Sequence, residues 1–283
     1  MIFLSTTVPP STAVAPFLDF NNPTVLMSIT IGGFLLLALA LLFYGWLGSR
    51  ILKKSTLPEQ PFTLVDVGAA SLLSAWLIWV ICNSFGQDEQ INLTLIALNS
   101  LLYFCLVGGI TGLLYFRHLK PIALFGLHPP HIGKIIKMAL LYLAAVYPLL
   151  VLSQSAIQPF VSNENDVQSL VLYFLKHPGW KERCSLIAMA TLVAPIAEEF
   201  IFRGYLYGVM RRFLGRVPGI ALSSLLFAAM HLHLPSMPGL TVLAVALCLL
   251  YERTGSLWAN IMVHATFNTI SIVMLLIFKE AVI

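Results

Sequence analysis

Long apolar stretches separated by short polar segments dominate the chain. A helix needs about 20 predominantly apolar residues to cross the hydrocarbon core of a bilayer. The shortest apolar stretch could also form a tilted, half-buried or re-entrant helix, so the pattern allows seven to nine helices. We expect an all-α polytopic membrane protein with about eight transmembrane helices, at approximately Thr24–Trp46, Leu64–Cys82, Ile91–Phe116, Ile135–Leu152, Ser185–Gly208, Val217–His233, Leu240–Tyr251 and Leu257–Phe278.

The composition supports this class. Of the 283 residues, 59% are hydrophobic and only 10% are charged, and the mean hydropathy is +0.90. Soluble domains carry about 25% charged residues, so a soluble protein is excluded. The length suits a single integral membrane domain over residues 1–283, in which the proline-containing first twenty residues are expected to be flexible.

Basic residues are distributed unevenly among the loops, which predicts an orientation. With eight helices and the N-terminus outside, eleven of the sixteen Lys and Arg residues fall on the cytoplasmic side, as the positive-inside rule requires. They are Arg50, Lys53, Lys54, Arg117, Lys120, Lys134, Lys137, Arg211, Arg212, Arg216 and Arg253. They are scattered over several loops rather than gathered on one face, so no nucleic-acid partner is predicted.

Two features of the sequence argue against disulfide or thiolate metal sites and against a cleavable signal peptide. The four cysteines are isolated, and no Cys-x-x-Cys pair indicates a disulfide framework or a thiolate metal site. No basic residue precedes Arg50, so a cleavable signal peptide is not expected.

Two adjacent carboxylates, Glu198 and Glu199, lie inside the fifth apolar stretch, and Arg203 follows one turn later. Ionisable groups at bilayer depth are costly and by default indicate a functional site. Glu199 and Arg203 are four residues apart, in the favourable order for an ion pair on one helix face. Glu198 points about 100° away around the helix axis. We therefore expect Glu199 to be neutralised by Arg203, and Glu198 to face a cavity as a general base. A purely structural ion network is the alternative.

Two further helices bring polar side chains into the apolar interior. His231 follows Phe227 by one turn, so the phenyl ring can wall the imidazole, whereas His233 is expected at the helix end. On the last helix, His264 and Asn268 are four residues apart and share a face. Asn260, one turn before His264, is a weaker candidate for the same face. Each of these residues alone could simply be a hydrogen-bonded packing residue.

Together these residues include a base, a second group that can hold water, and two potential oxyanion donors. That inventory suits hydrolysis of an acyl group by an activated water without a covalent intermediate. No serine stands in a Gly-x-Ser-x-Gly context, and no cysteine neighbours the set.

Three ordered motifs, Glu198-Glu199-x-x-x-Arg203, Phe227-x-x-x-His231 and His264-x-x-x-Asn268, resemble those of the CPBP (Abi) group. This group includes type II CAAX prenyl proteases and bacteriocin-processing membrane proteins. The resemblance covers roughly Thr191–Thr269, within the expected catalytic helices at residues 185–278. It implies a glutamate-dependent intramembrane endopeptidase of eight helices, without a metal or other cofactor. By the resemblance, Glu198 and His231 activate water, His264 and Asn268 stabilise the oxyanion, and Glu199 and Arg203 support the site.

Several alternatives stay open at this stage. Two histidines and a glutamate could ligate zinc, although no His-Glu-x-x-His segment is present. A proton-coupled transporter also uses buried Glu, Arg and His, but no internal repeat is apparent. The third alternative is a non-catalytic membrane binding partner.

The expected partners are a peptide or protein substrate, which could carry a lipid, and the bilayer. The expected location is a prokaryotic inner membrane, with the site open to the cytoplasm.

Overall fold

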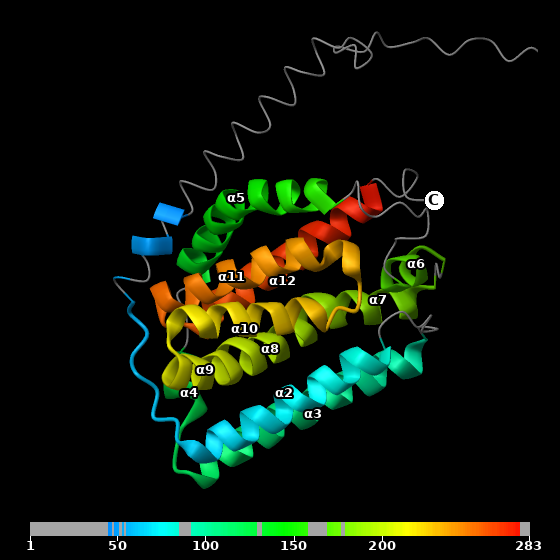
Figure 1. Cartoon of the computed structure of the whole chain (residues 1–283). Coiled ribbons are helices and arrows are strands. Elements are labelled where there is room, and N and C mark those ends of the chain that lie inside the picture. The colour runs from blue at the N-terminus through cyan, green and yellow to red at the C-terminus, as the bar shows by residue number, and fades with distance from the viewer. Residues whose placement is uncertain are drawn as a thin grey trace, which may run out of the picture. The chain divides into compact units, whose positions relative to one another are not determined.

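The computed structural model describes residues 45–46, 48–50, 53, 55–84, 92–128, 132–157, 169–176 and 179–277. Every regular element within these ranges is a helix (Figure 1), in agreement with the predicted all-α class. The expected flexible N-terminal segment lies outside the described residues. So does the first predicted helix, except for its last two residues.

Side chains at the helix ends explain where α2 (Leu64–Ser84) and α3 (Leu93–Phe116) begin. The Asp66 carboxylate accepts a hydrogen bond from the Thr63 N–H at 2.7 Å, which is one half of a capping box. Asn92 caps α3 by accepting from the Leu95 N–H at 2.8 Å. Asp66 also pairs with Arg117. This ion pair ties the start of α2 to the end of α3.

The candidate glutamates lie on one long helical segment, Trp180–Leu214, which contains two π-helical stretches. Its parts are α7 (Trp180–Ala188), η2 (Met189–Val193), α8 (Ala194–Glu198), η3 (Glu199–Leu206) and α9 (Tyr207–Leu214). The π-helical stretch η2 ends just before Pro195, which lacks an N–H and crowds the carbonyl four residues earlier. The segment extends beyond the predicted Ser185–Gly208 at both ends. Local π-helical geometry is frequent at functional sites.

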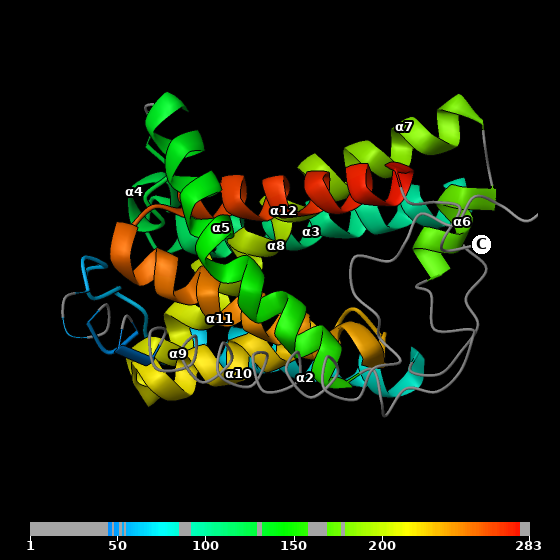
Figure 2. The same ribbon diagram turned by 90° about the horizontal axis from the view of Figure 1, so that it is seen from above.

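The remaining helices pack around this segment (Figures 1 and 2). α10 packs against α9 and α11, while α5 packs against α11 and α12. Both α3 and α12 contact α8, so the glutamates lie between these two helices. The bounds of the elements not yet given are α4 Pro121–Leu124, α5 Ile132–Ile157, α6 Ser169–Lys176, α10 Arg216–Ala229, η4 (3₁₀) Leu234–Ser236, α11 Met237–Thr254 and α12 Leu257–Ile277.

Five helical segments in the described part of the chain are long and apolar enough to cross a membrane. The protein is therefore a polytopic membrane protein. The predicted short seventh helix is longer than expected, because η4 and α11 together form a 21-residue segment. Shorter apolar helices occur at Ala139–Ser153 and Arg216–Ala229. The five segments are Leu64–Ser84, Leu93–Phe116, Trp180–Leu214, Leu234–Thr254 and Leu257–Ile277.

The prediction for the sixth helix was wrong at its C-terminal end. α10 stops at Ala229 rather than at His233, so His231 lies in the turn that follows. Leu232 has a left-handed φ of 53°, a conformation in which an α-helix cannot continue. The chain then turns into η4, which begins at Leu234.

One end of the bundle gathers several of the loops that the sequence analysis assigned to the cytoplasm. We call it the basic end; it contains Arg117, Arg211, Arg212, Arg216 and Arg253. Thr56 bonds the carbonyls of Glu252 and Arg253, while Arg211 bonds the carbonyls of Leu57 and Pro58. The Leu257 N–H donates to the carbonyl of the fully buried Phe125 at 3.0 Å. The ends of α3, α9 and α11 and the beginnings of α2, α10 and α12 therefore meet there.

Candidate active site

The predicted ion pair between Glu199 and Arg203 is present in the structure. Arg203 Nη1 lies 2.7 Å from Glu199 Oε1, and both residues are almost completely buried. The guanidinium also lies 4.2 Å from the centroid of the Phe227 ring, within the range of a cation–π interaction. The charge of Glu199 is thus compensated inside the helix bundle.

Glu199 has two further partners, both on α12. Its Oε1 atom lies 2.8 Å from His264 Nδ1, and its Oε2 atom accepts from Asn260 Nδ2 at 3.2 Å. The same amide nitrogen donates to the Leu247 carbonyl at 2.8 Å. An ionised carboxylate can only accept hydrogen bonds, so His264 presents Nδ1–H to Glu199. The Nε2 atom of His264 is then directed away from Glu199.

Glu198 differs from Glu199 in exposure and in partners. It remains 9% exposed, whereas Glu199 is fully buried. The Tyr103 hydroxyl of α3 donates to Glu198 Oε1 at 2.5 Å. The other oxygen, Oε2, lies 3.7 Å from His264 Nε2, beyond hydrogen-bond distance. Tyr103 therefore binds one carboxylate oxygen of Glu198, and the other oxygen faces an imidazole nitrogen.

The Phe227 ring connects the three groups of candidate residues. Its centroid lies 4.9 Å from that of His231 and 5.7 Å from that of His264. The predicted wall beside the His231 imidazole is confirmed. His231 Nδ1 lies 2.9 Å from the Phe227 carbonyl, which can only accept, so Nδ1 carries the hydrogen. In the neutral ring the Nε2 atom of His231 is then an acceptor.

His231 and His233 have different surroundings. The half-buried His231 ring contacts the Phe227 ring, which also contacts Arg203 and His264, two of the partners of Glu199. His233 Nδ1 instead lies 3.1 Å from the Ser236 hydroxyl in the turn before α11. His231 therefore belongs with the glutamates, while His233 bonds within its own turn.

Asn268 lies one turn beyond His264 on α12, but its side chain bonds a different element. Its Nδ2 atom donates to the Ala190 carbonyl of η2 at 2.8 Å. A side-chain amide nitrogen has two N–H groups, so this bond uses only one of them. The structure does not place Asn268 in hydrogen-bond contact with either glutamate.

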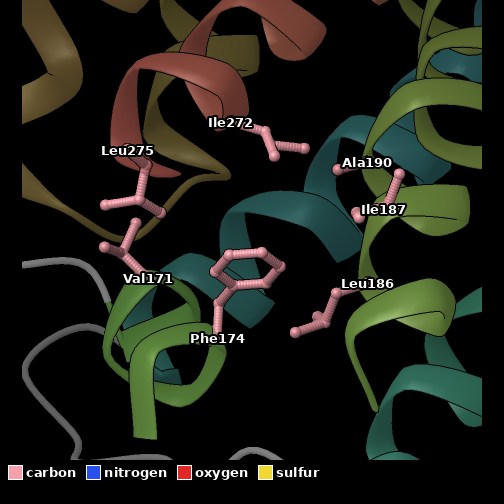
Figure 3. Close-up of a pocket in the computed structure, with 7 residues that line it drawn as sticks. All are labelled: Val171, Phe174, Leu186, Ile187, Ala190, Ile272 and Leu275. Carbon is pink, nitrogen blue, oxygen red and sulfur yellow. The ribbon is translucent and has the colours of Figure 1, made fainter. Parts of the chain in front are cut away.

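An apolar pocket lies between α6, α7, η2 and α12 (Figure 3). Its lining residue Ala190 also accepts the hydrogen bond from Asn268. Only apolar side chains of α6, α7, η2 and α12 line it, including Phe174, Ala190 and Ile272. Ile272 follows Asn268 by one turn of α12. The described side chains that line it include no acid, base or nucleophile.

No group of three or more His, Cys, Asp and Glu residues in the described ranges is arranged to hold a metal ion. Glu199 instead bonds Arg203, His264 and Asn260, while Glu198 bonds Tyr103. This arrangement fits acid–base chemistry by side chains, and a chelator tests whether a metal takes part.

The sequence analysis missed Tyr103 and gave Asn260 too little weight. Tyr103 lies on a helix without any recognised motif, and one tyrosine in an apolar helix cannot be distinguished from a packing residue. Asn260 shares a face with His264, which was a usable signal. It is fully buried and bonded to Glu199.

Comparisons with known proteins find similarity in the segment that carries the three motifs. Residues 180–270 match the family described as type II CAAX prenyl endopeptidase Rce1-like. The chain is also 30% identical over 89 residues to a Bacillus subtilis (strain 168) protein named "Putative membrane peptidase YdiL". That alignment covers 31% of this chain and 36% of the relative, so it spans about a third of the relative's length. No solved structure matches the chain. Residues 180–270, which contain the three motifs, are therefore similar to the type II CAAX prenyl endopeptidase Rce1-like family.

Proposed function

We propose that the protein is an intramembrane endopeptidase that hydrolyses a peptide bond with a water molecule activated by Glu198 and His231. The observation that carries this proposal is the difference between the two adjacent glutamates. Glu199 is fully buried and compensated by Arg203, whereas Glu198 keeps 9% exposure and, within the described part of the chain, has one oxygen without a hydrogen-bond donor. An accessible carboxylate beside imidazole nitrogens is suited to general base catalysis.

In the proposed reaction, water lies between Glu198 Oε2 and His231 Nε2. Glu198 takes a proton from the water as the oxygen attacks the carbonyl carbon of the scissile bond. The resulting tetrahedral intermediate collapses when the C–N bond breaks, and the proton held by Glu198 passes to the leaving amine. The products are a new carboxylate and a free amine, with no covalent enzyme intermediate.

His264 and Asn268 are proposed to stabilise the oxyanion. The second N–H of the Asn268 amide remains for this role beside the bond to Ala190. His264 is oriented by Glu199, as an imidazole is oriented by a carboxylate in other acid–base sites. For this role His264 must carry a hydrogen on Nε2 as well as on Nδ1, because only an N–H group can donate to an oxyanion. Glu199 and Arg203 support the site by holding that orientation.

We further propose eight transmembrane helices, with the basic end facing the cytoplasm of a prokaryotic cell. The five candidate segments account for most of the eight, and α5 and α10 contain shorter apolar stretches. The remaining predicted helix, Thr24–Trp46, falls almost entirely outside the described residues. The positive-inside rule favours a cytoplasmic basic end, and the bacterial relative fits a prokaryotic inner membrane.

The proposed substrate is a membrane-associated peptide or protein that is processed near its C-terminus, as in CAAX-type processing. The apolar pocket between α6, α7, η2 and α12 supports a substrate with a hydrocarbon group, whether this is a lipid modification or a run of apolar side chains. The proposal requires no cofactor.

The proposal is tested by peptide cleavage with the purified protein in detergent. The substrates are prenylated CAAX peptides and unmodified peptides with hydrophobic C-terminal ends, each with and without a chelator. We expect cleavage that survives the chelator and falls by about 10²- to 10⁴-fold in Glu198→Gln, the usual contribution of a general base. Glu182→Gln, with a carboxylate outside the site, is the matched control and should cleave normally.

The same experiment separates the alternatives. Loss of cleavage with chelator and its recovery with zinc would contradict the glutamate mechanism and favour a metallohydrolase. A folded wild type that cleaves no peptide of the panel would count against the peptidase. Proton-coupled uptake in vesicles would then favour a transporter over a binding partner.

A further inference from the structure

Tyr103 of α3 is the one contact to Glu198 in the described structure that comes from outside the segment matched by the family. Its hydroxyl donates to Glu198 Oε1 at 2.5 Å. The matched segment covers residues 180–270, and α3 ends at Phe116. The candidate site is thus completed by a helix that carries none of the three motifs.

The Tyr103 bond has the geometry of a strong interaction. A hydroxyl that donates to an ionised carboxylate forms a charge-assisted bond of about 2.5–2.7 Å. Tyrosine approaches on a rigid ring, so the bond restricts the carboxylate of a side chain that otherwise has three rotatable torsions. Packing of α3 against α8 fixes the position of the ring.

The bond also makes the two oxygens of Glu198 unequal. Oε1 is occupied by Tyr103, while Oε2 is 3.7 Å from His264 Nε2 and has no donor within hydrogen-bond distance among the described residues. A base must present a free oxygen to the proton that it removes. Without Tyr103, the carboxylate could rotate and exchange its two oxygens between α3 and the histidines.

We propose that Tyr103 is a positioning residue that fixes the Glu198 carboxylate so that Oε2 faces the water and the substrate carbonyl. This inference rests on the proposed peptidase function and deepens it. Tyr103 does not touch the reacting atoms; it acts through Glu198. A merely structural role would instead make Tyr103 a partner that only compensates a buried carboxylate.

The kinetic test compares Tyr103→Phe with wild type and with Tyr115→Phe. Tyr115 is an exposed tyrosine on the same helix, so this control removes a hydroxyl without touching the site. We expect Tyr103→Phe to lower kcat about tenfold and to change KM by less than about twofold, since the loss concerns the transition state. Tyr115→Phe should match wild type.

A second variant restores the donor. Incorporation of 4-aminophenylalanine at position 103 replaces the hydroxyl by an N–H donor on the same ring. We expect it to recover kcat to within about threefold of wild type, because the bond to Oε1 is remade. A loss of kcat that the amino analogue does not recover would overturn the positioning role, as would a wild-type kcat in Tyr103→Phe.

A spectroscopic readout separates this inference from the function on which it rests. With 3-fluorotyrosine at position 103, the ¹⁹F resonance should move in Glu198→Gln and stay unchanged in Glu182→Gln. An unchanged resonance in Glu198→Gln would contradict the bond itself. If the bond is present but wild-type protein cleaves no peptide, the proposed function fails and the positioning role fails with it. If wild type cleaves and Tyr103→Phe does so equally, only the inference about Tyr103 fails.

Discussion

The bundle contains two buried ionic clusters that look alike but differ in one respect. At the basic end, Glu252 is fully buried and lies 2.5 Å from both the Tyr207 hydroxyl and Arg211 Nε. Arg216 Nε lies 3.7 Å from its other oxygen. In the candidate active site, Glu199 is likewise buried and paired with an arginine. Only the active-site cluster adds a second, partly accessible carboxylate, Glu198, and two imidazoles.

This difference distinguishes carboxylates that stabilise the fold from the carboxylate that is proposed to act in catalysis. A buried carboxylate that is paired with an arginine fixes the helices that supply its partners. Glu252 does this for α9, α10 and α11, and Glu199 does it for η3 and α12. Among the described residues no donor lies within hydrogen-bond distance of Glu198 Oε2, and in the proposed function this oxygen takes a proton from bound water. We therefore expect substitutions of Glu199, Glu252 or their partners to lower mainly the stability of the protein. Substitutions of Glu198 should lower mainly its peptide turnover.

The largest expected stability effect is that of Arg203→Met. This change leaves the Glu199 carboxylate buried without its cation, which typically costs about 3–5 kcal/mol of the free energy of unfolding. We expect a large fall in the melting temperature in detergent. The matched control is Arg212→Met, because Arg212 pairs with Glu59 at the surface. Such exposed pairs contribute about 0–1 kcal/mol. Equal melting temperatures for the two variants would contradict the proposal that Arg203 stabilises the fold.

A smaller effect is expected from Gly126→Ala at the basic end. Gly126 has a left-handed φ of 62°, and an added Cβ would overlap the carbonyl oxygen of Gly255. The strain and the overlap together should cost about 2–4 kcal/mol. Gly109→Ala is the control, since Gly109 has open space around it within α3 and should gain up to about 1 kcal/mol. Thermal unfolding of both variants measures the difference, and a stable Gly126→Ala variant would contradict the close contact.

The smallest of these effects is expected from Glu252→Gln. The amide keeps the size of the side chain and one acceptor, and Arg216 is partly exposed, so water can compensate part of the lost charge. We expect a loss of about 1–3 kcal/mol, the cost of an imperfectly satisfied buried group. Peptide cleavage per folded molecule should stay at the wild-type level. A loss of peptide cleavage without a loss of stability would indicate a catalytic role for Glu252. It would contradict the proposal that this cluster only stabilises the fold.

The apolar pattern was sufficient to predict the helical class and most helices, because a bilayer leaves few other structures open to long apolar stretches. Spacing within one helix was equally informative. The Glu199–Arg203 pair and the Phe227–His231 contact each join residues one turn apart, and both are confirmed.

Contacts between helices could not be predicted in the same way. Tyr103 reaches Glu198 only because α3 packs against α8, and no spacing along the chain contains that information. Asn268 bonds Ala190 because η2 approaches α12 there. The end of α10 at Ala229 depends on the left-handed Leu232, although leucine rarely adopts that conformation. These features depend on tertiary packing.

The central claim is that Glu198 acts in catalysis, whereas Glu199 and Glu252 stabilise the fold. The most direct test measures peptide turnover per folded molecule and the melting temperature for Glu198→Gln and Glu252→Gln side by side. We predict that Glu198→Gln loses about 10²- to 10⁴-fold in turnover with an almost unchanged melting temperature. We predict the opposite for Glu252→Gln, with a lower melting temperature and wild-type turnover. Wild-type turnover in a folded Glu198→Gln variant would contradict the account.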